Sequence, residues 1–164
     1  MKILKKQSVA WLITLVMIAA AIGIGFSKRP DTSPSGSSYI WDDAGVLSSR
    51  TKQTLNKRND RLLKDCDAII GVATCNYNGD DLGSYAMQLG DQMGLGGYDM
   101  IVVLDISGDN YWLLQGTNLV SYFTDQDCSD YAWTYMETPF SKGDYDNAVL
   151  SLTQALENWY RQNR

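Results

Sequence analysis

Residues 100–106, Met-Ile-Val-Val-Leu-Asp-Ile, form a nearly continuous apolar run. A strand with apolar side chains on both faces must be covered on both sides, which is typical of a central strand in an α/β sheet. Turn residues follow at 107–110, and Tyr111–Leu114 is a second aromatic and aliphatic run. The pattern predicts a buried central strand that returns through a tight turn into an antiparallel neighbour.

Elements on either side place this strand in a layered fold. Residues 68–74 read as another buried strand, and residues 82–89 carry apolar side chains at helical spacing between the two strands. This order predicts a βαβ unit with parallel strands. Further helices are expected at 48–64, 119–123, 127–136 and 144–160. The sequence thus predicts an α/β fold, a three-layer α/β/α sandwich around a mixed sheet of three or four strands.

The first 38 residues differ in composition from the rest. Residues 7–27 carry no charge and are mostly apolar, and about 20 such residues span a bilayer core of roughly 30 Å. We therefore divide the chain into a cytoplasmic tail and transmembrane anchor at 1–27, a Pro/Ser/Gly tether at 28–38 and a folded domain at 39–164. Lysines before the apolar segment favour an N-terminus inside, with the domain on the extracytoplasmic side of the cell membrane.

A cleaved signal peptide is the alternative for this segment. Ala19–Ala21 offers a small-residue cleavage site after the apolar core. Cleavage there would leave a mature chain that starts with the apolar residues 22–26. The signal-anchor reading is preferred for that reason.

Charge and residue content exclude several classes of function. From Tyr39 onward, nine Lys and Arg face eighteen Asp and Glu, and an acidic domain is a poor partner for nucleic acid. The chain contains no histidine, which excludes Ser-His-Asp and Cys-His nucleophile arrangements and His-ligated zinc. The three cysteines, Cys66, Cys75 and Cys128, show no metal-binding spacing and are expected to be buried free thiols, although one bond to Cys128 is sterically open.

Three stretches resemble the TPM domain family, which takes its name from a thylakoid lumen acid phosphatase, a photosystem II repair protein and a modulator of acetylcholine receptors. They are Tyr-Ile-Trp-Asp-Asp-Ala-Gly-Val-Leu-Ser at 39–48, Asp-Met-Ile-Val-Val-Leu at 99–104 and Phe-Ser-Lys-Gly-Asp-Tyr at 140–145. Residues 109–116 are similar to a form found in membrane-anchored members from Gram-positive bacteria. The resemblance implies an α/β/α sandwich, in agreement with the pattern above.

Carboxylates are the groups available for chemistry. The resemblance implies that some members bind a divalent cation near acids matching Asp42 and Asp99, and the opening loop and the start of the central strand are expected to meet at one rim. We therefore predict Asp42, Asp43 and Asp99 as ligands of Ca²⁺ or Mg²⁺, since hard cations prefer oxygen. The alternative is that Asp42 caps its own turn. A second acidic cluster, at 125, 127 and 130, is expected to cap a helix.

Two functions follow from these observations. The first is a membrane-anchored extracytoplasmic module that assists assembly, repair or regulation of a membrane protein complex through protein interaction. The second is a metal-assisted acid phosphatase (a phosphomonoesterase) that uses Asp residues. Many family members carry an arginine where this chain has Tyr111, and a Gly-x-Gly where it has Gly116-Thr-Asn118. These departures favour the non-enzymatic function.

Overall fold

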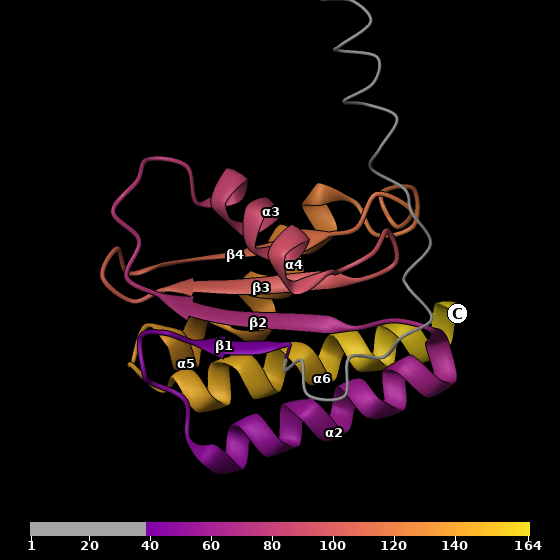
Figure 1. Cartoon of the computed structure of the whole chain (residues 1–164), viewed down its shortest axis with the longest axis horizontal. Coiled ribbons are helices and arrows are strands. Elements are labelled where there is room, and N and C mark those ends of the chain that lie inside the picture. The colour runs from indigo at the N-terminus through magenta and orange to yellow at the C-terminus, as the bar shows by residue number, and fades with distance from the viewer. Residues whose placement is uncertain (1–38) are drawn as a thin grey trace, which may run out of the picture. The chain divides into compact units, whose positions relative to one another are not determined.

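A computed structural model describes residues 39–164, which form an α/β domain with a four-stranded mixed sheet (Figure 1). The strands lie in the order β1 (Ile40–Asp42), β2 (Ile70–Cys75), β3 (Met100–Asp105) and β4 (Asn110–Gln115). The predicted anchor and tether, 1–27 and 28–38, fall outside these residues. Within 39–164, no helix has the length and apolar content needed to cross a bilayer.

The strand directions of the sheet are those predicted. β1, β2 and β3 are parallel, with Asp42 opposite Thr74 and Thr74 opposite Leu104. β4 returns antiparallel to β3, with Val103 opposite Trp112. The predictions of a parallel pair at 68–74 and 100–106, and of an antiparallel return strand, are confirmed.

Five helices cover the sheet in the part of the chain that the structure describes. They are α2 (Ser49–Cys66), α3 (Leu82–Met93), α4 (Asp125–Tyr135), α5 (Glu137–Phe140) and α6 (Tyr145–Asn163). The long helices begin at polar caps that accept a backbone N–H, as Ser48 does from Thr51 at 3.2 Å and Asp81 does from Ser84 at 2.9 Å. The prediction of a helix at 119–123 is wrong. That segment forms successive turns, closed by bonds such as Tyr122 N–H to the Leu119 carbonyl at 2.7 Å.

Side chains that alternate along β2 and β3 build two separate cores. Val72, Val102 and Leu104 face α2 and α6, whereas Ala73 and Val103 face α3. Figure 1 shows α2 and α6 together on one side of the sheet and α3 on the other. The chain moves across the sheet in the same direction from β1 to β2 and from β2 to β3. Because α2 and α3 lie on opposite faces, the two crossovers have opposite hands, and one of them has the rare left-handed sense.

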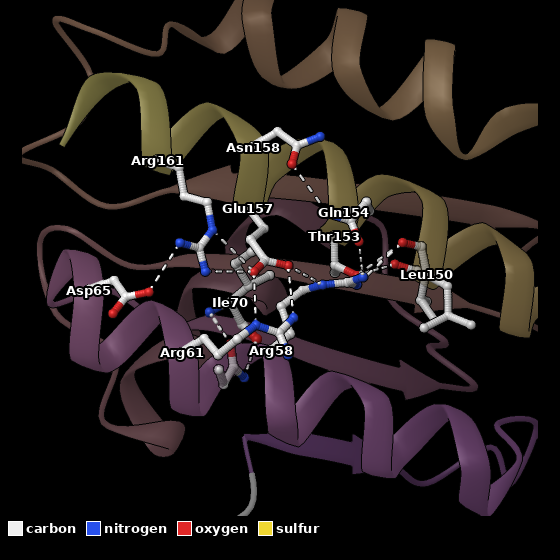
Figure 2. A network of polar contacts seen from close by, with 12 residues as sticks. Arg58, Arg61, Asp65, Ile70, Leu150, Thr153, Gln154, Glu157, Asn158 and Arg161 are labelled. Carbon is white, nitrogen blue, oxygen red and sulfur yellow. Dashed lines mark hydrogen bonds and ion pairs between the residues drawn. The ribbon is translucent and has the colours of Figure 1, made fainter.

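A buried ion-pair cluster joins α2 to α6 (Figure 2). Glu157, 3% exposed, accepts from Arg58 at 2.9 Å, from Arg61 at 3.2 Å and from Arg161 at 3.1 Å. Arg58 is itself 5% exposed and also donates to the Thr153 hydroxyl. Burial alone would raise the pKa of Glu157, but the hydrogen bonds from the three arginines outweigh it and hold that pKa below its usual value. The cluster therefore fixes the relative position of the two longest helices.

The three cysteines are buried and free. The prediction of free thiols is therefore confirmed.

Replacing Glu157 tests how much this cluster contributes to the stability of the domain. Glu157→Gln leaves the Arg58 guanidinium buried without a counter-charge, and we expect a loss of about 3 kcal/mol in the free energy of unfolding at pH 7, measured by chemical denaturation. Asp65→Asn is the matched control, because the Asp65–Arg161 pair is exposed on both sides, and should cost less than about 1 kcal/mol. Equal losses in the two variants would contradict this role for Glu157.

The same cluster predicts a pH dependence. The folded-state pKa of Glu157 lies below the usual value of about 4.3, so in acid the unfolded state takes up the proton first. The stability contributed by the cluster is complete at neutral pH and is lost as the pH falls below that usual value toward the folded-state pKa. Denaturation curves between pH 7 and pH 3 should show a steeper acid decline for the wild-type chain than for Glu157→Gln. If the stability of both chains declines equally with falling pH, the proposed contribution of Glu157 is contradicted.

Candidate functional site at the carboxyl edge of the sheet

The carboxyl ends of β1 and β2 lie at a switch point of the topology. After Asp42 the chain passes to α2 on one face, and after Cys75 it passes to α3 on the other. In open α/β sheets, ligands bind in the crevice where neighbouring strands send their connections to opposite faces. The residues at this edge are therefore the first to consider as a site.

Asp42 organises the loop at this edge. One carboxylate oxygen accepts from the Val46 amide at 3.0 Å and from the Thr74 hydroxyl at 2.6 Å. The other accepts from the Leu47 amide at 3.2 Å and lies 2.6 Å from Lys52 Nζ. Burial would raise the pKa of Asp42, but Lys52 and the hydrogen bonds lower it. Both oxygens are thus engaged, which agrees with the capping alternative for this residue.

Asp105 joins two loops at the end of β3. One of its oxygens accepts from the Tyr77 amide at 2.9 Å, the Ser107 hydroxyl at 3.0 Å and the Gly108 amide at 3.1 Å. Through these bonds, the β2–α3 loop is tied to the β3–β4 turn. Asp105 is only 5% exposed. It is a structural carboxylate of this edge that the sequence analysis did not include among the site residues.

Cys75 ends β2 at this edge and is the register partner of Asp105 on β3. Burial, and then the charges of Asp105 and Asp43, raise the pKa of its thiol to about 11. A thiol of that pKa is protonated at neutral pH and is a poor nucleophile. Cys75 is therefore a core residue at the rim of the crevice.

Asp99 lies at the opposite end of the sheet. It is buried, and its carboxylate accepts from the Ile69 amide at 2.7 Å and from the Gly96 amide at 2.6 Å. These bonds hold the loops that lead into β2 and β3 against each other. Asp99 is therefore a structural residue at the amino ends of the parallel strands, which we call the amino edge of the sheet.

The predicted convergence of Asp42, Asp43 and Asp99 is therefore wrong. Asp42 is level with Leu104 across the sheet, through Thr74. Five residues of extended strand separate Leu104 from Asp99, which is about 16 Å. In parallel strands, a residue that precedes one strand and a residue that ends another lie at opposite edges.

The remaining acids fit a calcium cage poorly. Within residues 39–164, no group of three or more His, Cys, Asp or Glu is placed to hold a metal ion. Ca²⁺ takes six to eight oxygen ligands. At the carboxyl edge, Asp43 is exposed, and the described residues donate hydrogen bonds to only one of the two Asp105 oxygens, so protein carboxylates would supply few of the ligands. Of the three acids of α4, Asp127 forms the expected capping box with Thr124, whereas Asp125 accepts from the Gln115 side chain and Asp130 from the Gln126 side chain.

A second surface lies along β4, the edge strand. A groove of about 510 Å³ runs between β4 and α4, and its lining residues are Tyr111–Gln115, Asp125, Cys128, Ser129, Ala132 and Trp133. Trp112 is 44% exposed and Trp133 is 68% exposed. Trp112 extends over α3, where a side-chain carbon at Gly83 would lie 3.1 Å from its ring. Sequence reasoning predicted residues 111–114 as an antiparallel strand but missed this surface, because the pattern does not show which side chains of the strand other elements leave exposed.

Fold and site together define an α/β sandwich domain with an acidic, tightly bonded carboxyl edge and an aromatic groove at its antiparallel edge strand. The family model for the TPM domain matches residues 40–158. The chain belongs to the TPM domain family, as its three motifs indicated.

Solved structures share the fold. The N-terminal domain of a P. gingivalis protein has a TM-score of 0.67 at 22% identity, with 74% of this chain and 81% of that chain covered. The N-terminal domain of the cg2496 protein from Corynebacterium glutamicum has a TM-score of 0.62 at 20% identity, with 82% and 86% covered. The BA42 protein from Bizionia argentinensis has a TM-score of 0.54 at 11% identity, with 66% and 78% covered. No curated protein matches.

The position of Asp99 makes a prediction that separates it from any cation site. Asp99→Asn leaves one backbone amide without its acceptor, and we expect a loss of about 1–3 kcal/mol in the free energy of unfolding. Because Asp99 lies at the amino edge, the loss should be the same in EDTA and in millimolar Ca²⁺. Thermal melts of the full chain under both conditions measure this. A loss confined to Ca²⁺-containing buffer would restore Asp99 as a ligand.

Proposed function

We propose that the chain is a membrane-anchored TPM module whose domain lies on the extracytoplasmic side and binds a partner protein, assisting assembly, repair or regulation of a membrane complex. The observation that carries the proposal is the aromatic groove beside β4. Two exposed tryptophans flank it, and Tyr135 on the same helix is 41% exposed. Tryptophan and tyrosine are enriched in interfaces and are frequent anchors of binding energy.

The carboxyl edge gives weaker support to phosphatase chemistry. Phosphoryl transfer depends on cationic groups that hold and neutralise the phosphate. Lys52 contacts this edge, but it is 2.6 Å from Asp42 and is already paired. Asp43 is the exposed carboxylate there, and it is the residue that a metal-assisted phosphomonoesterase would use. The alternative therefore depends on Asp43 and a bound cation.

Binding of Ca²⁺ or Mg²⁺ stays a prediction. Because the parallel register places Asp42 and Asp99 at opposite ends of the strands, at most Asp42 and Asp43 of the three predicted ligands can share one ion. Water would complete the coordination sphere, as it commonly does for Mg²⁺.

The anchor is tested by topology. Lys2, Lys5 and Lys6 precede the apolar segment, so we expect protease added to intact cells to remove the domain while a cytoplasmic marker survives. Immunoblotting of the domain measures its loss. Protection of the domain until the cells are lysed would contradict the proposal, and a mature N-terminus near Ile22 would establish cleavage in place of an anchor.

Enzymatic activity is tested on the purified full chain in detergent micelles. With p-nitrophenyl phosphate as substrate, in EDTA or with millimolar Mg²⁺ or Ca²⁺, we expect no hydrolysis above that of Asp43→Asn. A metal-dependent rate at least tenfold above that variant would favour the phosphatase alternative.

A further inference from the structure

We propose that the free edge of β4 is a docking site for an extended, basic segment of the partner protein, which adds to the sheet as a fifth strand. This inference rests on the proposed binding function and deepens it, because it names the surface and the chemistry of the occupant. Figure 1 shows β1 and β4 as the two outer strands of the sheet. β4 is the longer of the two.

The hydrogen-bond phase of β4 fixes which of its backbone groups face outward. Gly116 N–H bonds to the carbonyl of Asp99, directly opposite, at 2.8 Å. Antiparallel pairs alternate between bonded and non-bonded. Trp112 and Leu114 therefore direct their backbone groups toward β3, whereas Leu113 and Gln115 direct theirs away from the sheet.

The outward groups are ready to pair with another strand. In the part of the chain that the structure describes, the amides of Leu113 and Gln115 have no hydrogen-bond acceptor, whereas the outward amide of Tyr111 is capped by the Asn110 side chain at 2.8 Å. An unpaired row of backbone groups is a template for strand addition. Both residues line the groove, as does Trp133. A strand that enters the groove could therefore accept hydrogen bonds from the Leu113 and Gln115 amides and pack against the Trp133 side chain.

Charge identifies the occupant. No residue from Asp65 to Ser141 is Lys or Arg, whereas twelve are Asp or Glu. This stretch contains both elements that line the groove, β4 and α4, so neither carries a basic residue, and Asp125 lies in the lining. An extended segment with Lys or Arg alternating with apolar residues complements this field. A second copy of β4 would bring the same acids face to face, and anionic lipid would be repelled.

The test uses a defined probe on the full chain in detergent micelles. The probe is a fluorescent peptide of alternating lysine and valine, and the matched peptide has glutamate in place of lysine. We expect the lysine peptide to bind at least tenfold more tightly by fluorescence anisotropy, with an affinity that falls as salt rises. Equal affinity of the two peptides would overturn the charge assignment.

Side-chain variants locate the binding. Trp133→Ala removes an exposed groove wall and should weaken binding of the lysine peptide at least fivefold. Tyr122→Ala is the matched control, because Tyr122 is 74% exposed and does not line the groove. It should bind like the wild-type chain. Similar losses in both variants would place the peptide elsewhere.

Amide hydrogen exchange followed by NMR distinguishes strand addition from simple side-chain contact. The Leu113 and Gln115 amides should exchange rapidly in the free chain and slowly with saturating peptide, whereas Trp112 and Leu114 should be protected in both states. Unchanged exchange at Leu113 and Gln115 would overturn the inference. It would also be overturned if the free chain forms a dimer that the peptide dissociates, because a second copy would then be the natural occupant of the β4 edge. These results do not depend on membrane topology, so failure of strand addition is distinguishable from failure of the proposed function.

Discussion

β2 and β3 carry apolar side chains on both faces, and strands of this kind are stable only where helices cover each side. α2 and α6 cover one face and α3 covers the other. This requirement sends the connections after β1 and β2 to opposite faces, which creates the crevice at their carboxyl ends. The paired layers, the unusual crossover and the position of the acidic edge all follow from it.

The layer of α2 and α6 depends on the buried contact between Glu157 and Arg58 (Figure 2). Two long helices pack here through a charged seam as well as through apolar residues, because three guanidinium groups satisfy one carboxylate. The charges of the domain are also unevenly distributed between its layers. Basic residues of the domain belong to this layer and its connections, whereas the opposite part of the domain is acidic. An acidic surface next to an exposed edge strand favours a partner of opposite charge.

The carboxyl edge and the β4 edge differ in how far their polar groups are satisfied. At the carboxyl edge, Asp42 and Asp105 use their oxygens to hold loops together. At β4, the outward amides of Leu113 and Gln115 have no partner within residues 39–164. Polar groups that are already bonded stabilise the fold, and unbonded groups are available for recognition. This contrast is why the β4 groove carries the proposed binding role.

Apolar periodicity by itself determined the central strands, the β3–β4 return and the helices α2, α3 and α6, because these patterns depend on neighbours close in the chain. The three motifs determined the family. Only the tertiary structure decided where the acids lie, since Asp42 and Asp99 are fixed at opposite edges by the parallel register of strands far apart in sequence. It also decided that Trp112 faces a groove and not the core, because exposure of an edge strand depends on which elements pack beside it.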